Sequence, residues 1–340
     1  MLGIDTSCDE TSVAVLDTKA KVLSNIVSSQ IKIHASFGGV VPELASRSHG
    51  ENISYVYDCA LGAAGIKEKD LSAVAVTFTP GLIGCLLVGL SFAKGLSYRL
   101  GIPLYGVNHL KAHLFSPFIP SGEIPYPILG LVVSGGHTAF YKVLNPDEVT
   151  LMGQTVDDAA GEAFDKCAKL LNLGYPGGPI VERLAQDGNE KAFPFTTARV
   201  KRGDQYLSFS GLKTALSHHV RDCGNLSPQL INDLCASVQK GIVDALVDKL
   251  KFFLRLHMYA CFALSGGVAM NACLRRRVQE VCAEFKLPCY LAGLEFCTDN
   301  GAMVAFAGML GKKSDEKFSL AALASQKLQT RLLKYEKTHS

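Results

Sequence analysis

The strongest constraint on the fold is one sequence plan that occurs twice in the chain. The first copy starts with residues 2–5 (LGID), passes through a small polar turn at 6–11 and continues as the alternating run 12–17. The second copy starts at 129–133 (LGLVV), turns at 134–138 (SGGHT) and continues at 139–144. Each copy predicts two strands joined by a tight connection. The repetition indicates an internal duplication.

The duplication extends beyond these hairpins. The first copy predicts a third strand at 21–28, a helix at 42–61, a strand at 73–78, a helix at 84–100 and a strand before His109. The second predicts a helix at 228–256, a strand at 260–264, a helix at 269–285 and a strand at 288–291. Strands followed by alternating helices and strands predict an α/β protein of two related lobes with a cleft between them. By analogy, this is the plan of the actin, sugar-kinase and heat-shock-chaperone ATPase folds, which bind a nucleotide in that cleft.

These patterns divide the chain into an N-terminal lobe, 1–125, and a C-terminal lobe, 126–300. We expect the helix that starts near residue 300 to pack back on the first lobe. The second lobe carries a helical insertion at about 156–226 that has no counterpart in the first, and such insertions at a cleft edge tend to add specificity. Residues 312–340 form a polar, lysine-rich tail.

Composition limits the class of protein. The chain has 340 residues, 48% of them hydrophobic, which is enough for two domains with cores. Its net charge of +3 is too small for binding to nucleic acid through the overall field, so any RNA contact should be a local patch. The sequence shows no signal-peptide pattern and no uninterrupted apolar run of about 18 residues, so we expect a cytoplasmic protein with no membrane association. Eleven cysteines without a CxxC pair indicate free thiols in a reducing compartment.

The segment 108–113 (NHLKAH) predicts a metal site. If a helix begins near His109, then His109 and His113 lie one turn apart on the same face, although such a pair can also be a surface feature. Asp299 stands at the matching point of the second lobe and is the natural third ligand, although an aspartate before a helix is more often an N-cap. Two imidazoles and a carboxylate suit iron(II) or zinc. Leu110 occupies the position of the metallopeptidase glutamate, so a peptidase would lack its base.

Two glycine turns can hold phosphate. The turns at 134–138 and 265–268 follow apolar strands, and their glycines let backbone N–H groups point at an anion, although either could be an ordinary turn. Four polar or glycine positions fall near the cleft-facing ends of their elements: Asp165, Gly178, Glu182 and Asn271. Carboxylates there could hold ribose hydroxyls, and an Asn one turn into a helix could reach the same nucleotide. The alternative for Asp165 and Glu182 is a solvated helix position.

Seven segments of the chain form a specific combination: 3–11 (GIDTSCDET), 38–47 (GGVVPELASR), 108–113 (NHLKAH), 133–138 (VSGGHT), 157–166 (DDAAGEAFDK), 174–179 (GYPGGP) and 208–214 (SFSGLKT). Together these motifs closely resemble the tRNA threonylcarbamoyladenosine transferases, the TsaD family. The match runs from residue 3 to about 310, and the SCDET start is similar to the bacterial and mitochondrial branch.

The resemblance implies a reaction and a set of residues. The threonylcarbamoyl group of threonylcarbamoyl-AMP would pass to N6 of the adenosine 3′ to the anticodon, in tRNAs that read codons beginning with A, and AMP would leave. His109, His113 and Asp299 would hold one divalent metal, with iron(II) preferred and zinc or magnesium as alternatives. The residues that would hold the adenylate are Val132, Val133, Ser134, Gly135, Gly136, Asp165, Gly178, Glu182 and Asn271.

The resemblance also implies partners. The bacterial enzyme would need a related two-lobed protein and a small P-loop ATPase, whereas the mitochondrial form would act as a homodimer. The tRNA anticodon loop would meet a basic surface, for which Arg199, Lys201 and Arg202, or the run 275–277 (RRR), are candidates. Three other functions stay open at this point: a non-catalytic scaffold of the same complex, a metallo-endopeptidase, and a small-molecule kinase.

Overall fold

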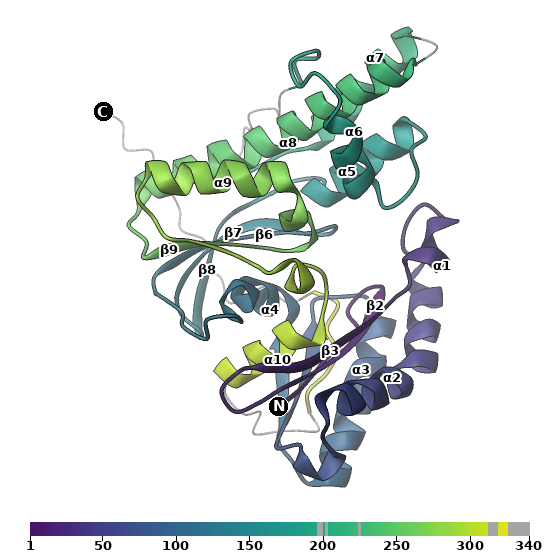
Figure 1. The fold of residues 1–340 in the computed structure, drawn as a ribbon, viewed down its shortest axis with the longest axis vertical. Coiled ribbons are helices and arrows are strands. Elements are labelled where there is room, and N and C mark those ends of the chain that lie inside the picture. Colours follow the sequence, from purple (N-terminus) through teal and green to yellow (C-terminus); the bar gives the residue numbers. More distant parts are fainter. Residues whose placement is uncertain (196–199, 201–202, 224–225, 312–318, 326–340) are drawn as a thin grey trace.

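The computed structural model describes residues 1–195, 200, 203–223, 226–311 and 319–325. The basic candidates Arg199, Lys201 and Arg202 and most of the polar tail lie outside these described residues. Two five-stranded sheets form two lobes, one above the other in Figure 1. The predicted fold class, two related α/β lobes, is confirmed.

The two sheets share one topology. The first has the order β3 (Val22–Ser29), β2 (Glu10–Leu16), β1 (Leu2–Asp5), β4 (Val74–Thr79) and β5 (Leu104–Asn108). The second has β8 (Glu148–Gln154), β7 (Thr138–Asn145), β6 (Ile128–Val133), β9 (Cys261–Ser265) and β10 (Cys289–Leu291). In both, the first strand pairs antiparallel with the second and parallel with the fourth. The repeated sequence plan therefore encodes a repeated sheet.

Helices cover both sheets. The first lobe has α1 (Ile31–Ala35), α2 (Pro42–Ala64), α3 (Ile83–Leu100) and α4 (His109–Phe115). The second has α5 (Ala160–Leu170), α6 (Gly177–Ala185), α7 (Ser210–Cys223), α8 (Pro228–Leu256) and α9 (Ala272–Glu284). The described residues also contain four 3-10 turns, at Glu68–Asp70, Ser116–Phe118, Gly267–Met270 and Leu294–Phe296. The expected single helix at 269–285 is wrong at its start, because Asn271 ends a 3-10 turn and caps α9.

The last described helix, α10 (Gly301–Leu310), returns to the first sheet and packs on β1 and β2. Glycines permit this close approach, since a Cβ on Gly3 would lie 2.1 Å from the carbonyl oxygen of Gly301. The N–H of Gly301 also donates to Ser12 Oγ at 2.8 Å. The segment before α10 is thereby fixed beside the start of β2.

One hydrophobic cluster spans both lobes and surrounds α4 and α10. It contains Val107 from the first sheet and Ile128 and Val132 from the second, together with the fully buried Phe115 and Phe118. Separate clusters lie under α2 and α3 and beneath α5 to α9. The elements between the lobes are therefore held by a shared core rather than by a flexible linker alone.

One described helix, α3, is long and apolar enough on average to cross a membrane. It contains Lys94 and Arg99, which interrupt the apolar run. In the structure 39% of this stretch is buried, and α3 packs against α2 and β4. The core helix of a soluble protein meets the same criterion, so α3 is weak evidence for a membrane span. The ten cysteines whose side chains are described are free thiols, as expected.

Candidate active site

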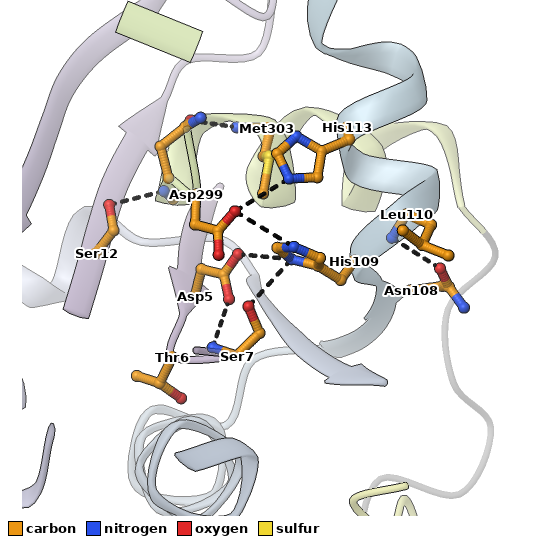
Figure 2. Close-up of polar contacts among 12 residues, drawn as sticks. Asp5, Thr6, Ser7, Ser12, Asn108, His109, Leu110, His113, Asp299 and Met303 are labelled. Atoms are coloured by element: carbon orange, nitrogen blue, oxygen red, sulfur yellow. Dashed lines mark hydrogen bonds and ion pairs between the residues drawn. The ribbon is translucent and has the colours of Figure 1, made fainter. Parts of the chain in front are cut away.

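Two histidines and an aspartate converge between the lobes. The helix α4 begins at His109, as predicted, because Asn108 Oδ1 accepts hydrogen bonds from the N–H groups of Leu110 at 3.0 Å and Lys111 at 3.2 Å. Asp299 Oδ1 lies 3.3 Å from His109 Nε2 and 3.0 Å from His113 Nε2 (Figure 2). The three ligand atoms lie within 4.8 Å of one another. This set fits a divalent metal with open positions.

A further carboxylate supports this cluster and was not assigned a role from the sequence. Asp5, fully buried at the end of β1, places Oδ2 3.1 Å from His109 Nδ1, and Ser7 Oγ lies 3.2 Å from the same nitrogen (Figure 2). Asp5 Oδ1 accepts the N–H of Ser7 at 2.9 Å. A proton held on Nδ1 leaves the Nε2 lone pair of His109 facing Asp299, which is the tautomer a metal ligand needs. His113 Nδ1 is buried and has no hydrogen-bond partner among the described residues.

Burial and charge oppose each other in the metal-free cluster. Burial disfavours the charged form of His109, but Asp299 and Asp5 outweigh it and hold the pKa of His109 well above its usual value. Burial likewise disfavours a charged Asp299, but the two imidazoles hold its pKa well below its usual value. For His113 burial dominates and lowers the pKa, despite the hydrogen bond to Asp299. Asp299 is therefore an anion, ready to act as a ligand.

The cluster opens into a cleft of about 840 Å³ between the lobes. His109 and Asp299 line it, whereas His113 is fully buried behind them. The opposite wall comes from the second lobe and contains the turn at 134–137 together with Asp165, Lys166 and Lys169. The metal candidates and the predicted phosphate turn thus face one cavity.

The turn after β6 is shaped to bind an anion. Two hydrogen bonds close its ends. The N–H of Ser134 donates to the carbonyl oxygen of His137 at 2.7 Å, and the N–H of His137 donates to Ser134 Oγ at 3.1 Å. Gly135 and Gly136 have open space where a Cβ would stand, and their N–H groups make no hydrogen bond within the described part of the chain. Val132 and Val133 are fully buried in β6 below the turn, so their side chains do not reach the cleft.

The second glycine turn is used differently. Gly266 has φ +95°, and a Cβ there would lie 2.3 Å from the carbonyl oxygen of Val133, so this glycine permits close packing of β9 on β6. Gly267 alone from this turn lines the cleft.

The remaining predicted residues lie at the N-termini of α6 and α9 or accept hydrogen bonds from them. Asp165 lines the cleft, and its carboxylate accepts the N–H groups of Gly177, at 2.7 Å, and Gly178. Burial raises the pKa of Asp165 in spite of these bonds. Glu182 Oε1 accepts the N–H of Ala272 at 2.7 Å, beside Asn271. Gly178, Glu182 and Asn271 do not line the cleft, so their binding roles stay predictions.

We expected Asn271 to lie one turn into a helix, but it is the N-cap residue of α9. Its Oδ1 accepts the N–H of Leu274 at 2.9 Å, and its Nδ2 donates to Gln239 Oε1 at 2.7 Å.

The arginine run 275–277 is occupied by contacts within the second lobe. Arg275 donates to the carbonyl oxygens of Ala269 and Ala292, both at 3.0 Å. Arg276 pairs with Glu280 at 2.7 Å and Arg277 with Asp244 at 2.9 Å. This run is therefore a poor candidate for the RNA surface.

Comparison of solved structures places the chain in a known architectural class. HypF from T. kodakarensis aligns with a TM-score of 0.62 at 15% identity, over 91% of this chain and 47% of that one. Component A of (R)-2-hydroxyglutaryl-CoA dehydratase from Acidaminococcus fermentans aligns with a TM-score of 0.54 at 14% identity, over 91% of this chain and 96% of that one. ROK hexokinase from Thermus thermophilus aligns with a TM-score of 0.50 at 15% identity, over 92% of this chain and 97% of that one. The chain is a two-lobed protein of the actin and sugar-kinase class with a candidate metal site in its cleft.

Sequence comparison identifies the family. The family model described as tRNA N6-adenosine threonylcarbamoyltransferase, TsaD, matches residues 21–306. Proteins of that name from Thermosipho africanus and Anaeromyxobacter dehalogenans are 47% and 49% identical to this chain, over 91% of it and over 93% and 92% of their own lengths. The chain belongs to the tRNA N6-adenosine threonylcarbamoyltransferase family.

The predicted activity is thereby confirmed. The protein is a transferase that places a threonylcarbamoyl group on adenosine in tRNA, which implies tRNA and threonylcarbamoyl-AMP as its substrates. The family also implies a metal, and the cluster of His109, His113 and Asp299 is a possible site for it.

Proposed function

We propose that the transfer takes place in the cleft between the lobes, onto N6 of the adenosine 3′ to the anticodon in tRNAs that read codons beginning with A, with AMP as the leaving group. One observation carries this proposal: His109 and Asp299, with His113 directly behind them, line the same cavity as Gly135 and Gly136, whose N–H groups are open. A site for an acyl carbonyl and a site for a phosphate thus lie on opposite walls.

The metal ligands in this proposal are His109 Nε2, His113 Nε2 and Asp299. Iron(II) is our first choice, with zinc or magnesium as alternatives, because two imidazoles and one carboxylate with open positions suit iron(II) and zinc. When bound, such an ion supplies Lewis acidity toward the carbamoyl carbonyl. Asp5 holds the proton of His109 on Nδ1 and so keeps Nε2 available.

The second lobe holds the adenylate. The N–H groups of Gly135 and Gly136 bind its phosphate, with the ammonium groups of Lys166 and Lys169 on the same wall of the cleft. Asp165 faces the cleft with its carboxylate already fixed by α6, a suitable acceptor for ribose hydroxyls. Val132, Val133, Gly178, Glu182 and Asn271 support this wall from behind the turn and at the starts of α6 and α9. The enzyme thereby contributes position and fixed charge.

The acceptor base enters from a single-stranded loop. His137 lines the cleft beside the phosphate turn, and burial and the neighbouring imidazoles lower its pKa to about 4. Its imidazole is therefore neutral at pH 7 and can accept a hydrogen bond from the attacking amine. This places a hydrogen-bond acceptor on the wall that carries the phosphate turn.

The partners that we propose are a related two-lobed protein and a small P-loop ATPase, in the cytoplasm. Exposed aromatic side chains on α2 and α3, Tyr55 at 72% and Tyr98 at 77%, favour a protein contact on the first lobe. The free cysteines fit a reducing compartment.

The test is transfer of labelled threonylcarbamoyl from its adenylate to unmodified tRNA, with the partner proteins supplied. We expect modified nucleoside from the wild type, little from His109→Ala, and none on a tRNA whose target adenosine is replaced by guanosine. Wild-type protein that gives no product, with tRNA and adenylate shown to be competent, would favour a scaffold. Equal product from both tRNAs would contradict the proposed position.

A further inference from the structure

A groove on the second lobe, outside the cleft, carries basic and hydroxyl side chains of α7 that have no role in the site above. It lies between α5 and α7 and has a volume of about 370 Å³. One face of α7 supplies most of its lining: Ser210, Lys213, Thr214, Ser217, His218 and Arg221, all of them exposed. Their spacing of three and four residues aligns them along a single stripe of the helix.

The groove adjoins the catalytic cleft at one shared residue. Lys166 of α5 lines both cavities, and its ammonium pairs with Asp158 at 2.6 Å and Glu162 at 2.9 Å. Lys169, one turn further, lines the cleft near Gly38 of the other lobe. Lys213 makes no ion pair with any residue that the structure describes, so its charge is not neutralised locally. Cationic side chains of α5 and α7 thus lie along the groove, together with the carboxylate of Asp158, which pairs with Lys166.

The helix holds this stripe in a fixed position. Asp157 caps α7 by accepting the N–H of Phe209 at 2.8 Å and the hydroxyl of Ser210 at 2.8 Å. The opposite face of α7 buries Leu212 and Leu216 in the core of the second lobe. The polar residues on the other face are exposed, and the helix itself lies above α5 and α6 in Figure 1.

We propose that this face of α7 binds the phosphate backbone of the tRNA anticodon stem-loop while the target base occupies the cleft. The inference rests on tRNA as the substrate of this cleft. From Ser210 to Arg221 the helix rises roughly 16 Å at 1.5 Å per residue, the length of about five stacked nucleotides at 3.4 Å each.

The chemistry of the stripe favours RNA over an acidic protein segment. The stripe holds three hydroxyls together with Lys213 and Arg221, and Ser, Thr, Lys and Arg are among the residues that contact phosphate oxygens. The stripe itself presents no large apolar side chain of the kind that anchors protein partners.

The test compares Lys213→Ala/Arg221→Ala with the wild type and with Lys19→Ala. Lys19 is a matched control, an exposed lysine on the β2–β3 turn of the other lobe that makes no ion pair with a described residue. Affinity for a full-length tRNA transcript is measured between about 50 and 200 mM salt, where each phosphate contact contributes about 0.7 to 0.9 to the slope of log K against log salt. We expect the double variant to reduce the magnitude of that slope by about 1.5, because two phosphate contacts are lost.

Kinetics separate this inference from the proposed function. With the partner proteins present, the KM for tRNA should rise several-fold in the double variant while the single-turnover rate at saturating tRNA is unchanged. Lys213→Arg should retain wild-type KM, because it keeps the charge. An unchanged salt slope and KM in the double variant, with wild-type transfer intact, would overturn the α7 surface and leave the function standing. Loss of partner-protein binding without loss of tRNA affinity would overturn it as well.

Discussion

Replacing Asp5 by Asn should weaken metal binding although Asp5 is not itself a proposed ligand. Asp5 uses both oxygens, Oδ2 toward His109 Nδ1 at 3.1 Å and Oδ1 toward the N–H of Ser7 at 2.9 Å. An amide has one oxygen, so it can satisfy only one of these donors, and it lacks the negative charge. A charge-assisted hydrogen bond contributes about 1 to 2 kcal/mol more than a neutral one. Metal affinity should therefore fall about 10- to 100-fold, the range found for partners of metal-bound histidines.

The assay is titration of metal-free protein with Zn²⁺ against a competing chelator, repeated with Fe²⁺ under anaerobic conditions. Asp17→Asn is the control, because Asp17 is a hydrogen-bonded carboxylate of the same lobe at an exposed turn. Thermal unfolding of the metal-free variants shows whether Asp5→Asn also perturbs the fold. Metal affinity within twofold of the wild type would refute the role assigned to Asp5, whatever the effect on activity.

Three further predictions follow from the same geometry. In metal-free protein the ion pair of His109 and Asp299 should stabilise the fold. The stabilisation from His109 is lost as pH rises through its raised pKa, and the stabilisation from Asp299 is lost as pH falls through its lowered pKa. Urea unfolding across pH, compared with His109→Ala, checks this, and an identical pH profile in both would contradict it. Glu182→Ala should cost about 1 kcal/mol of unfolding free energy, because it removes the acceptor for the N–H of Ala272, whereas Glu182→Gln keeps an acceptor. Adenylate affinity of Glu182→Gln, measured alongside, tests its binding role. Gly130→Ala should slow single-turnover transfer more than it weakens metal binding, because the added methyl group would meet Leu114 of α4. Equal effects on both would argue against this packing role.

The sequence predicted the repeated sheets from local patterns, and it predicted that Asp299 meets the two histidines because Asp299 stands at the matching point of the second copy of the plan. Apolar runs and glycine turns specify strands and their connections, and the spacing of His109 and His113 specifies one helix face. The role of Asp5 was not predicted, because its contact with His109 joins residues 104 positions apart and no spacing rule connects them. The one available signal was a buried aspartate at the end of an apolar strand. Asn271 was misplaced because a 3-10 turn and an α-helix share similar residue preferences, so the cap between them is not evident from the sequence.

The two halves of the candidate site belong to different lobes, so their separation depends on how α4 packs on β6. The metal candidates come from α4 and from the segment that α10 fixes on the first sheet, whereas the phosphate turn ends β6 of the second sheet. One close contact between them is Leu114 of α4 against Gly130 of β6, where a Cβ would lie 2.1 Å from Leu114 Cδ1. Leu114 is fully buried, so it cannot move aside without displacing its neighbours. An added methyl group should therefore shift α4 relative to the phosphate turn while leaving the ligands on α4 in register with each other. If Leu114→Val restores the rate in a Gly130→Ala background, the spacing between the metal wall and the phosphate wall limits the reaction.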